Sequence, residues 1–218
     1  MLFRSIRELM RRNRLRDGLV YMQVTRGVAR RDHAFPTTPV KPALVMTTKN
    51  TRRLDIEPGA GVAVKSHPDI RWERCDIKTV ALLPNVLAKQ AARESGAYEA
   101  WLIDGNGQIT EGASTNAWIV TPEGELITRQ TDNGILAGIT RQTLKALAGK
   151  LQLKLVERPF TLAEARRAKE AFITSATSFV TPVVKIDGET VGDGKPGPAA
   201  KRLREEYIRF ASAGEAVT

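Results

Sequence analysis

The chain has 218 residues, of which 42% are hydrophobic, and a formal net charge of +10 at pH 7. A chain of this size buries roughly 70% of the surface that it exposes when unfolded, so it can build a globular core or two small domains. No run of about 18 apolar residues could span a membrane, and the first residues lack the apolar core of a secretory signal. We therefore expect a soluble, cytoplasmic protein with no membrane partner.

The only cysteine, Cys75, rules out an internal disulfide, which fits a reducing compartment. Two histidines and one cysteine offer too few soft ligands for a zinc cluster. We therefore predict no metal site.

Most of the positive charge lies near the N-terminus. Residues 1–31 carry nine arginines against Glu8 and Asp17, a local charge of +7. Such a cluster can bind phosphate backbones or belong to a transit peptide, but it lacks interleaved aromatic residues and runs directly into an expected strand. A solvated or interface-forming helix face is the simplest interpretation, and we expect no nucleic acid partner.

The first third of the chain predicts one helix and two strands. Residues 3–15 have apolar side chains at helical spacing, and residues 19–25 and 43–48 have the composition of strands, separated by a proline-containing loop. The polar stretch 49–61 is either a hinge between two subdomains or a plain surface loop.

Strands and helices alternate beyond this stretch. Thr140 is expected as the N-cap of one helix, and Thr161 opens a short helix as a capping box. The pattern predicts an α/β or α+β fold with a substantial β-barrel or sheet. The expected strands or short apolar runs cover 61–65, 77–83, 98–103, 117–120, 125–128, 171–175 and 181–186, and the longer helices cover 85–96, 140–151 and 199–211.

Three separate segments carry chemistry that one ligand requires. Lys78, near the end of an expected strand, offers an amine that can form a Schiff base if it is buried or half-buried. Glu111, in an expected Thr-Glu-Gly turn, offers a carboxylate for a heterocyclic cation. The Gly138-Ile139-Thr140 segment opens a helix, where unpaired N–H groups and the helix dipole favour a phosphate. Pyridoxal 5'-phosphate uses all three.

Each of these features is ambiguous by itself. An exposed lysine, a turn glutamate and an ordinary helix N-cap are all common, and the hydroxyls of 114–116 and of 174–178 can simply bond their own backbone. It is their combination that favours a cofactor site.

In this combination and order, the chain resembles the class IV aminotransferases, the fold-type IV pyridoxal-phosphate-dependent enzymes, and within them most closely the D-amino acid aminotransferases. The resemblance implies an α+β fold of two subdomains, a small α/β domain and a larger β-barrel-like domain. The matching segments are Tyr21 to Gly27, the segment around Lys78, Thr110 to Asn116, Gly134 to Arg141 and Thr174 to Pro182.

The resemblance also assigns roles to individual residues. Lys78 would be the catalytic Schiff-base lysine, Glu111 would pair with the pyridine nitrogen, and Leu136 would pack beneath the ring. The remaining cofactor-binding residues would surround the phosphate: Ile139, Thr140, Ser175, Ala176 and Thr177.

The substrate class is implied by Arg31-Asp32-His33. An Arg-x-His at this place in D-amino acid aminotransferases traps the substrate α-carboxylate, reaching in from the partner subunit, so the resemblance implies that Arg31 and His33 bind substrate in a homodimer. A guanidinium binds a carboxylate through two hydrogen bonds and histidine adds a donor. Without the resemblance, a surface loop with two polar residues is the favoured explanation of both.

In one respect the chain departs from the family pattern. Members begin with a further segment that supplies a phosphate-binding arginine, and residues 1–16 match none of it. We therefore expect residues 1–50 to be the remnant of the small domain, 51–60 a linker, and 61–218 the large cofactor-binding domain.

The implied activity is transamination between a D-amino acid, of the D-alanine or D-glutamate type, and a 2-oxo acid. The alternatives are an aminodeoxychorismate lyase or a branched-chain aminotransferase of the same fold, or an impaired scaffold without cofactor.

Overall fold

The computed structural model describes residues 2–51 and 60–214. The chain divides into two compact units, Met1–Asp55 and Ile56–Thr218. Strand structure continues through Asn50, so the start of the hinge predicted for 49–61 was wrong, and residues 52–59 of that hinge lie outside the described residues. In the described ranges, no helix is long and apolar enough to cross a membrane.

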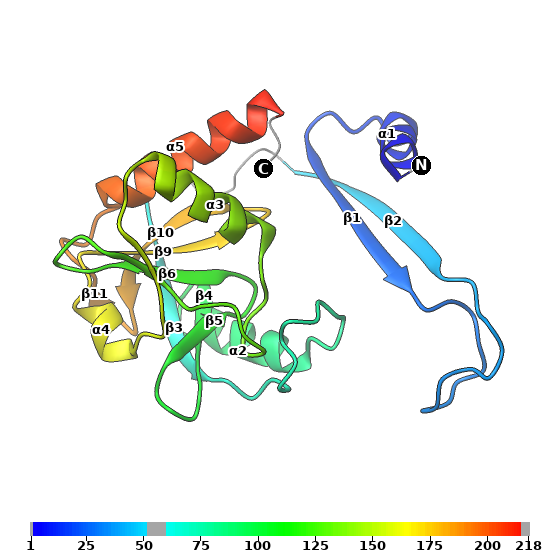
Figure 1. The fold of residues 1–218 in the computed structure, drawn as a ribbon, viewed down its shortest axis with the longest axis horizontal. Coiled ribbons are helices and arrows are strands. Elements are labelled where there is room, and N and C mark those ends of the chain that lie inside the picture. Colours follow the sequence, from blue (N-terminus) through cyan, green and yellow to red (C-terminus); the bar gives the residue numbers. More distant parts are fainter. Residues whose placement is uncertain (1, 52–59, 215–218) are drawn as a thin grey trace. The chain divides into compact units, whose positions relative to one another are not determined.

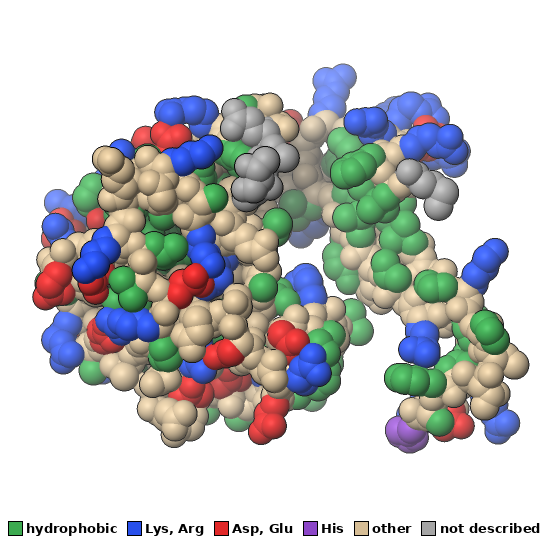
Figure 2. Space-filling view, in the orientation of Figure 1, with side chains coloured by type: hydrophobic (Ala, Val, Ile, Leu, Met, Phe, Trp, Pro, Cys, Tyr) green, Lys and Arg blue, Asp and Glu red, His purple; other side chains and the backbone are tan. Residues whose placement is uncertain are grey.

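The first unit contains one helix and a two-stranded hairpin (Figure 1). Helix α1 (Leu2–Arg12) ends slightly earlier than predicted, and strands β1 (Gly18–Thr25) and β2 (Ala43–Asn50) confirm the two predicted strands. They pair antiparallel along their whole length. Figure 2 shows basic side chains gathered over α1, where Glu8 forms ion pairs with neighbouring arginines of the same helix. Four of the nine arginines of this cluster therefore lie exposed on one helix, and the other five follow it in the chain.

The second unit is built on one sheet of nine strands. From one end to the other the order is β5-β4-β3-β10-β9-β6-β7-β8, and β11 pairs with β10. The bounds are β3 Val62–Pro68, β4 Glu99–Ile103, β5 Ile109–Gly112, β6 Asn116–Val120, β7 Leu126–Thr128, β8 Leu155–Glu157, β9 Glu170–Ser175, β10 Phe179–Ile186 and β11 Glu189–Thr190.

The two ends of this sheet approach each other. Gln108, just before β5, forms an antiparallel bridge with Thr161, just after β8. The N–H of Ile109 donates to the carbonyl of Phe160 at 2.9 Å. The sheet therefore curls into a partly closed barrel, as the predicted α+β fold with a barrel-like domain requires.

Alternating side chains of the strands face two different cores. Ile119 and Ile173 belong to the core enclosed by the curled sheet, which also contains Trp101 and Phe160. Their neighbours Trp118 and Phe172 face outward and stack with ring centroids 5.5 Å apart, in a second core beneath two helices.

Those two helices are α3 (Ile139–Lys150) and α5 (Pro198–Ala213), which lie on the same side of the sheet in Figure 1. Helix α2 (Leu83–Glu94) packs its alanines against β4 in a third, smaller core. The short helix α4 (Leu162–Arg166) begins after Thr161, whose hydroxyl accepts from the Glu164 N–H at 3.1 Å, so the predicted cap is confirmed.

Three local predictions were wrong. The apolar run 77–83 forms no strand, because it has no sheet partner among the described residues: residues 77–82 form a surface loop, and Leu83 already begins α2. The Thr110-Glu111-Gly112 segment is not a turn but belongs to β5, which pairing with β4 stabilises. The N-cap of α3 is Gly138, so Thr140 lies within the first helical turn.

The start of α5 depends on one buried carboxylate. Glu170 accepts hydrogen bonds from the backbone N–H groups of Ala199 and Ala200, both at 3.0 Å. Replacing Glu170 with alanine should lower the free energy of unfolding by about 1–3 kcal/mol, because it leaves two inward-facing donors without an acceptor. Urea denaturation measures this effect. A loss equal to that of an exposed control, Glu205→Ala, would contradict the capping role.

Candidate active site

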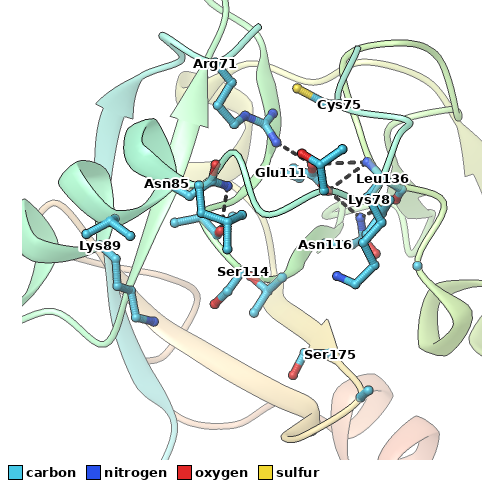
Figure 3. Close-up of a pocket in the computed structure, with 18 of the residues that line it drawn as sticks. Arg71, Cys75, Lys78, Asn85, Lys89, Glu111, Ser114, Asn116, Leu136 and Ser175 are labelled. Carbon is cyan, nitrogen blue, oxygen red and sulfur yellow. Dashed lines mark hydrogen bonds and ion pairs between the residues drawn. The ribbon is translucent and has the colours of Figure 1, made fainter. Parts of the chain in front are cut away.

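A cavity of about 850 Å³ opens at one side of the second unit, between the 71–82 loop, α2, the end of β5 and the start of α3 (Figure 3). Its walls include residues from each segment of this unit for which the sequence predicted a role in cofactor binding. The predicted site residues that line it are Lys78, Glu111, Leu136, Ile139, Thr140, Ser175 and Ala176.

Glu111 forms the buried end of an ion-pair chain. Arg71 donates from Nη1 to Glu111 Oε1 at 2.5 Å, and from Nε and Nη2 to the two carboxylate oxygens of Asp69 at 2.9 and 2.7 Å. The side chains of Arg71 and Glu111 are only 6% and 7% exposed. Thr110 donates to Asp69 at 2.8 Å. One guanidinium thus holds two carboxylates in fixed positions.

Two further donors orient the Glu111 carboxylate. The N–H of Leu136 donates to Oε1 and Oε2 at 3.1 and 3.2 Å, and Asn116 Nδ2 donates to Oε2 at 2.8 Å. Figure 3 shows these contacts beside the cavity. Burial raises the pKa of Glu111 to about 7, although Arg71 and the Leu136 N–H act in the opposite direction. A carboxyl group with this pKa can hold or release a proton near neutral pH.

This pKa makes stability depend on pH. Glutamic acid ordinarily releases its proton near pH 4.5, whereas folded Glu111 retains it up to about pH 7. The contribution of Glu111 is therefore complete below pH 4.5 and is lost as the pH rises through 7. We expect the free energy of unfolding of the unaltered chain to fall by up to about 3 kcal/mol, relative to Glu111→Gln, between pH 5 and pH 8. Urea denaturation at both pH values checks this, and a relative gain with rising pH would contradict it.

Lys78 lies in the loop between β3 and α2, and its side chain is exposed. The expectation of a buried or half-buried amine at a strand end was therefore wrong, because residues 69–82 pair with no strand in the part of the chain that the structure describes. Cys75 anchors the loop, since its N–H donates to the carbonyl of Asn133 at 2.8 Å. The amine still belongs to the cavity wall.

The first turn of α3 forms one corner of the cavity. Its N-cap, Gly138, contributes no side-chain hydrogen bond, and Ile139 and Thr140 line the cavity wall. A side chain at Gly138 would have its Cβ 2.3 Å from Asn116 Oδ1, so only glycine allows this close approach. The positive end of a twelve-residue helix therefore faces the cavity.

A hydroxyl-rich turn between β9 and β10 forms the other side of that corner. Ser175 Oγ lies 2.7 Å from Ser178 Oγ and accepts from the Ser178 N–H at 3.1 Å. Ser175 and Ala176 line the cavity. Thr177 is exposed and does not line the cavity. Its Oγ1 atom lies 3.2 Å from Ser175 Oγ. We call the first turn of α3 and residues 175–178 the anion corner.

The 112–116 segment lies between Glu111 and the anion corner. Ser114 donates to Glu99 at 2.7 Å, and Asn85 Nδ2 donates to the carbonyl of Ala113 at 2.8 Å. Thr115 is 8% exposed, and its hydroxyl has no hydrogen-bond partner in the described part of the chain. That hydroxyl oxygen is itself buried, so it lies beneath the cavity surface and not on it.

Arg31 and His33 belong to the first unit, whereas the cavity is formed by residues of the second. Both side chains are exposed, in the loop between β1 and β2, and the N–H of His33 donates to Asp32 at 2.6 Å. Their predicted role in substrate binding stays a prediction.

Sequence reasoning missed Asp69 and Arg71, although they carry the electrostatics of the site. A signal was present, because an Asp-x-Arg triplet directly after a strand can form a local ion pair. That this pair reaches Glu111, forty residues along the chain, is decided by two strand pairings, of β3 with β4 and of β4 with β5.

The residues of the cavity fit a planar heterocyclic ring that carries a phosphate. A buried carboxylate suits a ring nitrogen, a free amine suits an aldehyde, and the helix start and hydroxyl turn suit a dianion.

Comparisons with known proteins agree with this chemistry. The family "Amino-transferase class IV" matches residues 2–186. A D-alanine aminotransferase of Staphylococcus haemolyticus is 43% identical over 208 residues, which cover 94% of this chain and 72% of that protein. Among solved structures, the Escherichia coli branched-chain amino acid aminotransferase superposes with a TM-score of 0.83 at 25% identity, covering 96% of this chain and 70% of that one. The branched-chain amino acid aminotransferase of T.th., solved with pyridoxamine 5'-phosphate, gives a TM-score of 0.80 at 27% identity, covering 97% of this chain and 70% of that one.

The chain therefore belongs to the class IV aminotransferases and has their fold. Enzymes of this class use pyridoxal phosphate. Within the class, this chain is a homologue of the D-alanine aminotransferases, which confirms the subfamily expected from the sequence.

Proposed function

We propose that this chain catalyses transamination between a D-amino acid and a 2-oxo acid, with pyridoxal phosphate bound in the 850 Å³ cavity. The observation that carries the proposal is that an amine, a buried carboxylate and an anion corner line one cavity, in a chain 43% identical to a D-alanine aminotransferase. When bound, the cofactor supplies an aldehyde that takes up an amino group and a ring that withdraws electrons from the substrate Cα.

The chain's own residues have distinct tasks in this proposal. Lys78 would hold the cofactor through Nζ and, once released from it, would carry the proton that leaves or joins the substrate Cα. Glu111 takes a charged hydrogen bond from the ring nitrogen, and Arg71 keeps that carboxylate in place. Leu136 packs against one face of the ring.

The phosphate is proposed to lie in the anion corner. Ile139 and Thr140 at the start of α3 and Ser175 and Ala176 in the opposite turn would surround it, with Thr177 supporting Ser175 by hydrogen bonding. Fixing the phosphate there orients the ring between Lys78 and Glu111, so that the same amine stays within reach of the reacting carbon.

Arg31 and His33 are proposed to bind the substrate α-carboxylate, by analogy with the D-amino acid aminotransferases. In this assignment, residues 1–50 belong to a small domain, 51–60 to a linker and 61–218 to the cofactor-binding domain. A guanidinium paired with the substrate carboxylate determines which face of the substrate meets the ring. It therefore determines whether the D- or the L-isomer reacts.

A homodimer is the proposed assembly. The 70–87 segment of the second unit carries many exposed apolar side chains, among them Val80 at 65% and Leu83 at 68% exposure. Clusters of this kind are typical of protein interfaces. Light scattering tests the proposal: a mass twice 24.0 kDa is expected, and Leu83→Asp should reduce it.

The decisive assay supplies D-alanine with 2-oxoglutarate and measures pyruvate. Pyruvate should form only when both substrates are present, and L-alanine should give none. Preference for L-valine would favour a branched-chain aminotransferase, and pyruvate from an aminated chorismate-like substrate without any acceptor would favour a lyase. Absence of turnover with bound cofactor would contradict the proposed activity.

A further inference from the structure

Arg204, in the middle of α5, is a buried cation without a counter-ion among the described residues. The residue is 7% exposed, and it forms no ion pair in residues 2–51 and 60–214. Its Nε and Nη2 atoms have no hydrogen-bond partner there either. Burial lowers the pKa of Arg204, yet a guanidinium keeps its charge at neutral pH. A buried charge lowers stability unless an opposite charge or hydrogen bonds compensate it. The contacts of Arg204 therefore indicate the role of this residue.

The contacts of Arg204 are to the hydroxyl-rich turn of the anion corner. Nη1 donates to the carbonyl of Ser178 at 3.0 Å and to the carbonyl of Val180 at 2.5 Å. Between these two residues, Phe179 has a positive φ of 59°, a conformation that a bulky residue rarely adopts. Arg204 therefore bridges the carbonyls on both sides of a strained residue and stabilises the turn.

Through Ser178 this bridge reaches the cavity. The Ser178 hydroxyl lies 2.7 Å from that of Ser175, which lines the cavity. With its carbonyls engaged by Arg204, the turn presents hydroxyls on its other side. Helix α5 also contacts the opposite half of the anion corner, because Tyr207 Oη lies 3.4 Å from Thr140 Oγ1.

We propose that Arg204 is a positioning residue for the phosphate of the cofactor. From behind the 175–178 turn it fixes the hydroxyls that face the cavity, and its uncompensated charge favours a dianion in the anion corner. This inference rests on the proposed function, but it concerns the phosphate and not the aldehyde or the ring. Its effect is therefore on binding of a phosphate group, whichever molecule carries it.

The test compares three probes, pyridoxal 5'-phosphate, pyridoxal and inorganic phosphate, by isothermal titration calorimetry. Arg204→Gln keeps a donor but removes the charge, and Arg204→Lys keeps the charge. We expect Arg204→Gln to weaken binding of pyridoxal 5'-phosphate and of inorganic phosphate about tenfold, with pyridoxal changed less than about twofold. Arg204→Lys should retain most of the phosphate affinity. The exposed Arg202→Gln, on the same helix, is the matched control and should change nothing.

A second variant keeps the test decisive if Arg204→Gln does not fold. Ser178→Ala leaves Arg204 in place but removes the hydroxyl contact with Ser175. This variant should also bind pyridoxal 5'-phosphate and inorganic phosphate more weakly than the unaltered chain, with a smaller change for pyridoxal. Equal weakening of pyridoxal and pyridoxal 5'-phosphate would overturn the inference, as would equal affinities of Arg204→Gln and the unaltered chain. Failure of the unaltered chain to bind pyridoxal 5'-phosphate or pyridoxal would contradict the proposed function, while inorganic phosphate would still decide the role of Arg204.

Discussion

Replacing Lys78 with alanine should reduce D-alanine transamination roughly 10⁴-fold or more, because the variant loses both the covalent attachment of the cofactor and the group that moves the Cα proton. The amine lines the cavity in an exposed loop, so its removal should leave the fold intact. Pyruvate release measures the activity, and urea denaturation checks the stability.

A second readout of the same variant does not depend on turnover. Borohydride treatment of the cofactor-loaded chain should attach the cofactor to the peptide containing Lys78, and mass spectrometry should find no attachment in Lys78→Ala. The matched control is Lys201→Ala, an exposed lysine on α5, which should behave like the unaltered chain. Attachment to another lysine in the Lys78→Ala chain would show that the amine had been assigned to the wrong residue.

Replacing Arg71 with methionine should lower the free energy of unfolding at pH 8 by about 3–5 kcal/mol. Arg71 is the only ion-pair partner found for Asp69 and Glu111 in the described ranges, so the variant leaves two buried carboxylates without a counter-charge. The loss should be smaller at pH 5, because Glu111, with a pKa raised to about 7, is then protonated and carries no charge.

Urea denaturation at both pH values measures this effect. The exposed ion pair of Arg74 with Asp76 gives a control, since Arg74→Met should change stability little. Adding Asp69→Asn and Glu111→Gln to Arg71→Met should restore much of the stability, because no buried charge is then left unpaired. If Arg71→Met lowers the free energy of unfolding equally with and without the two added substitutions, lost packing and not unpaired charge explains the destabilisation.

The site residues recognised from the sequence lie in short continuous motifs. Glu111, Ile139, Thr140 and Ser175 could be named because each lies in a short motif that resembles the family's, and the cavity brings them together. Arg71 could not be assigned a role in the same way. Its position beside Glu111, forty residues along the chain, depends on the pairing of β3 with β4 and of β4 with β5.

The incorrect secondary-structure predictions have the same physical origin. Apolar residues at 77–83 have the composition of a strand, but a strand needs a neighbour to pair with, and this segment has none. Its side chains, such as Val80 and Leu83, remain exposed on the second unit. Glu111 lies in a strand because β4 supplies such a neighbour, although the Thr-Glu-Gly sequence is typical of a turn.

The sequence by itself determined the family, the order of most helices and strands, and the chemical groups of the cavity, because these depend on local pattern and short motifs. Only the tertiary structure decided which groups are buried and which charges meet. Packing buries Glu111, so that its pKa rises to about 7, brings Arg71 between two carboxylates, and leaves Arg204 without a counter-ion among the described residues. Each of these follows from removing water around a charge, and solvent exclusion is a property of the packed chain that no single segment possesses.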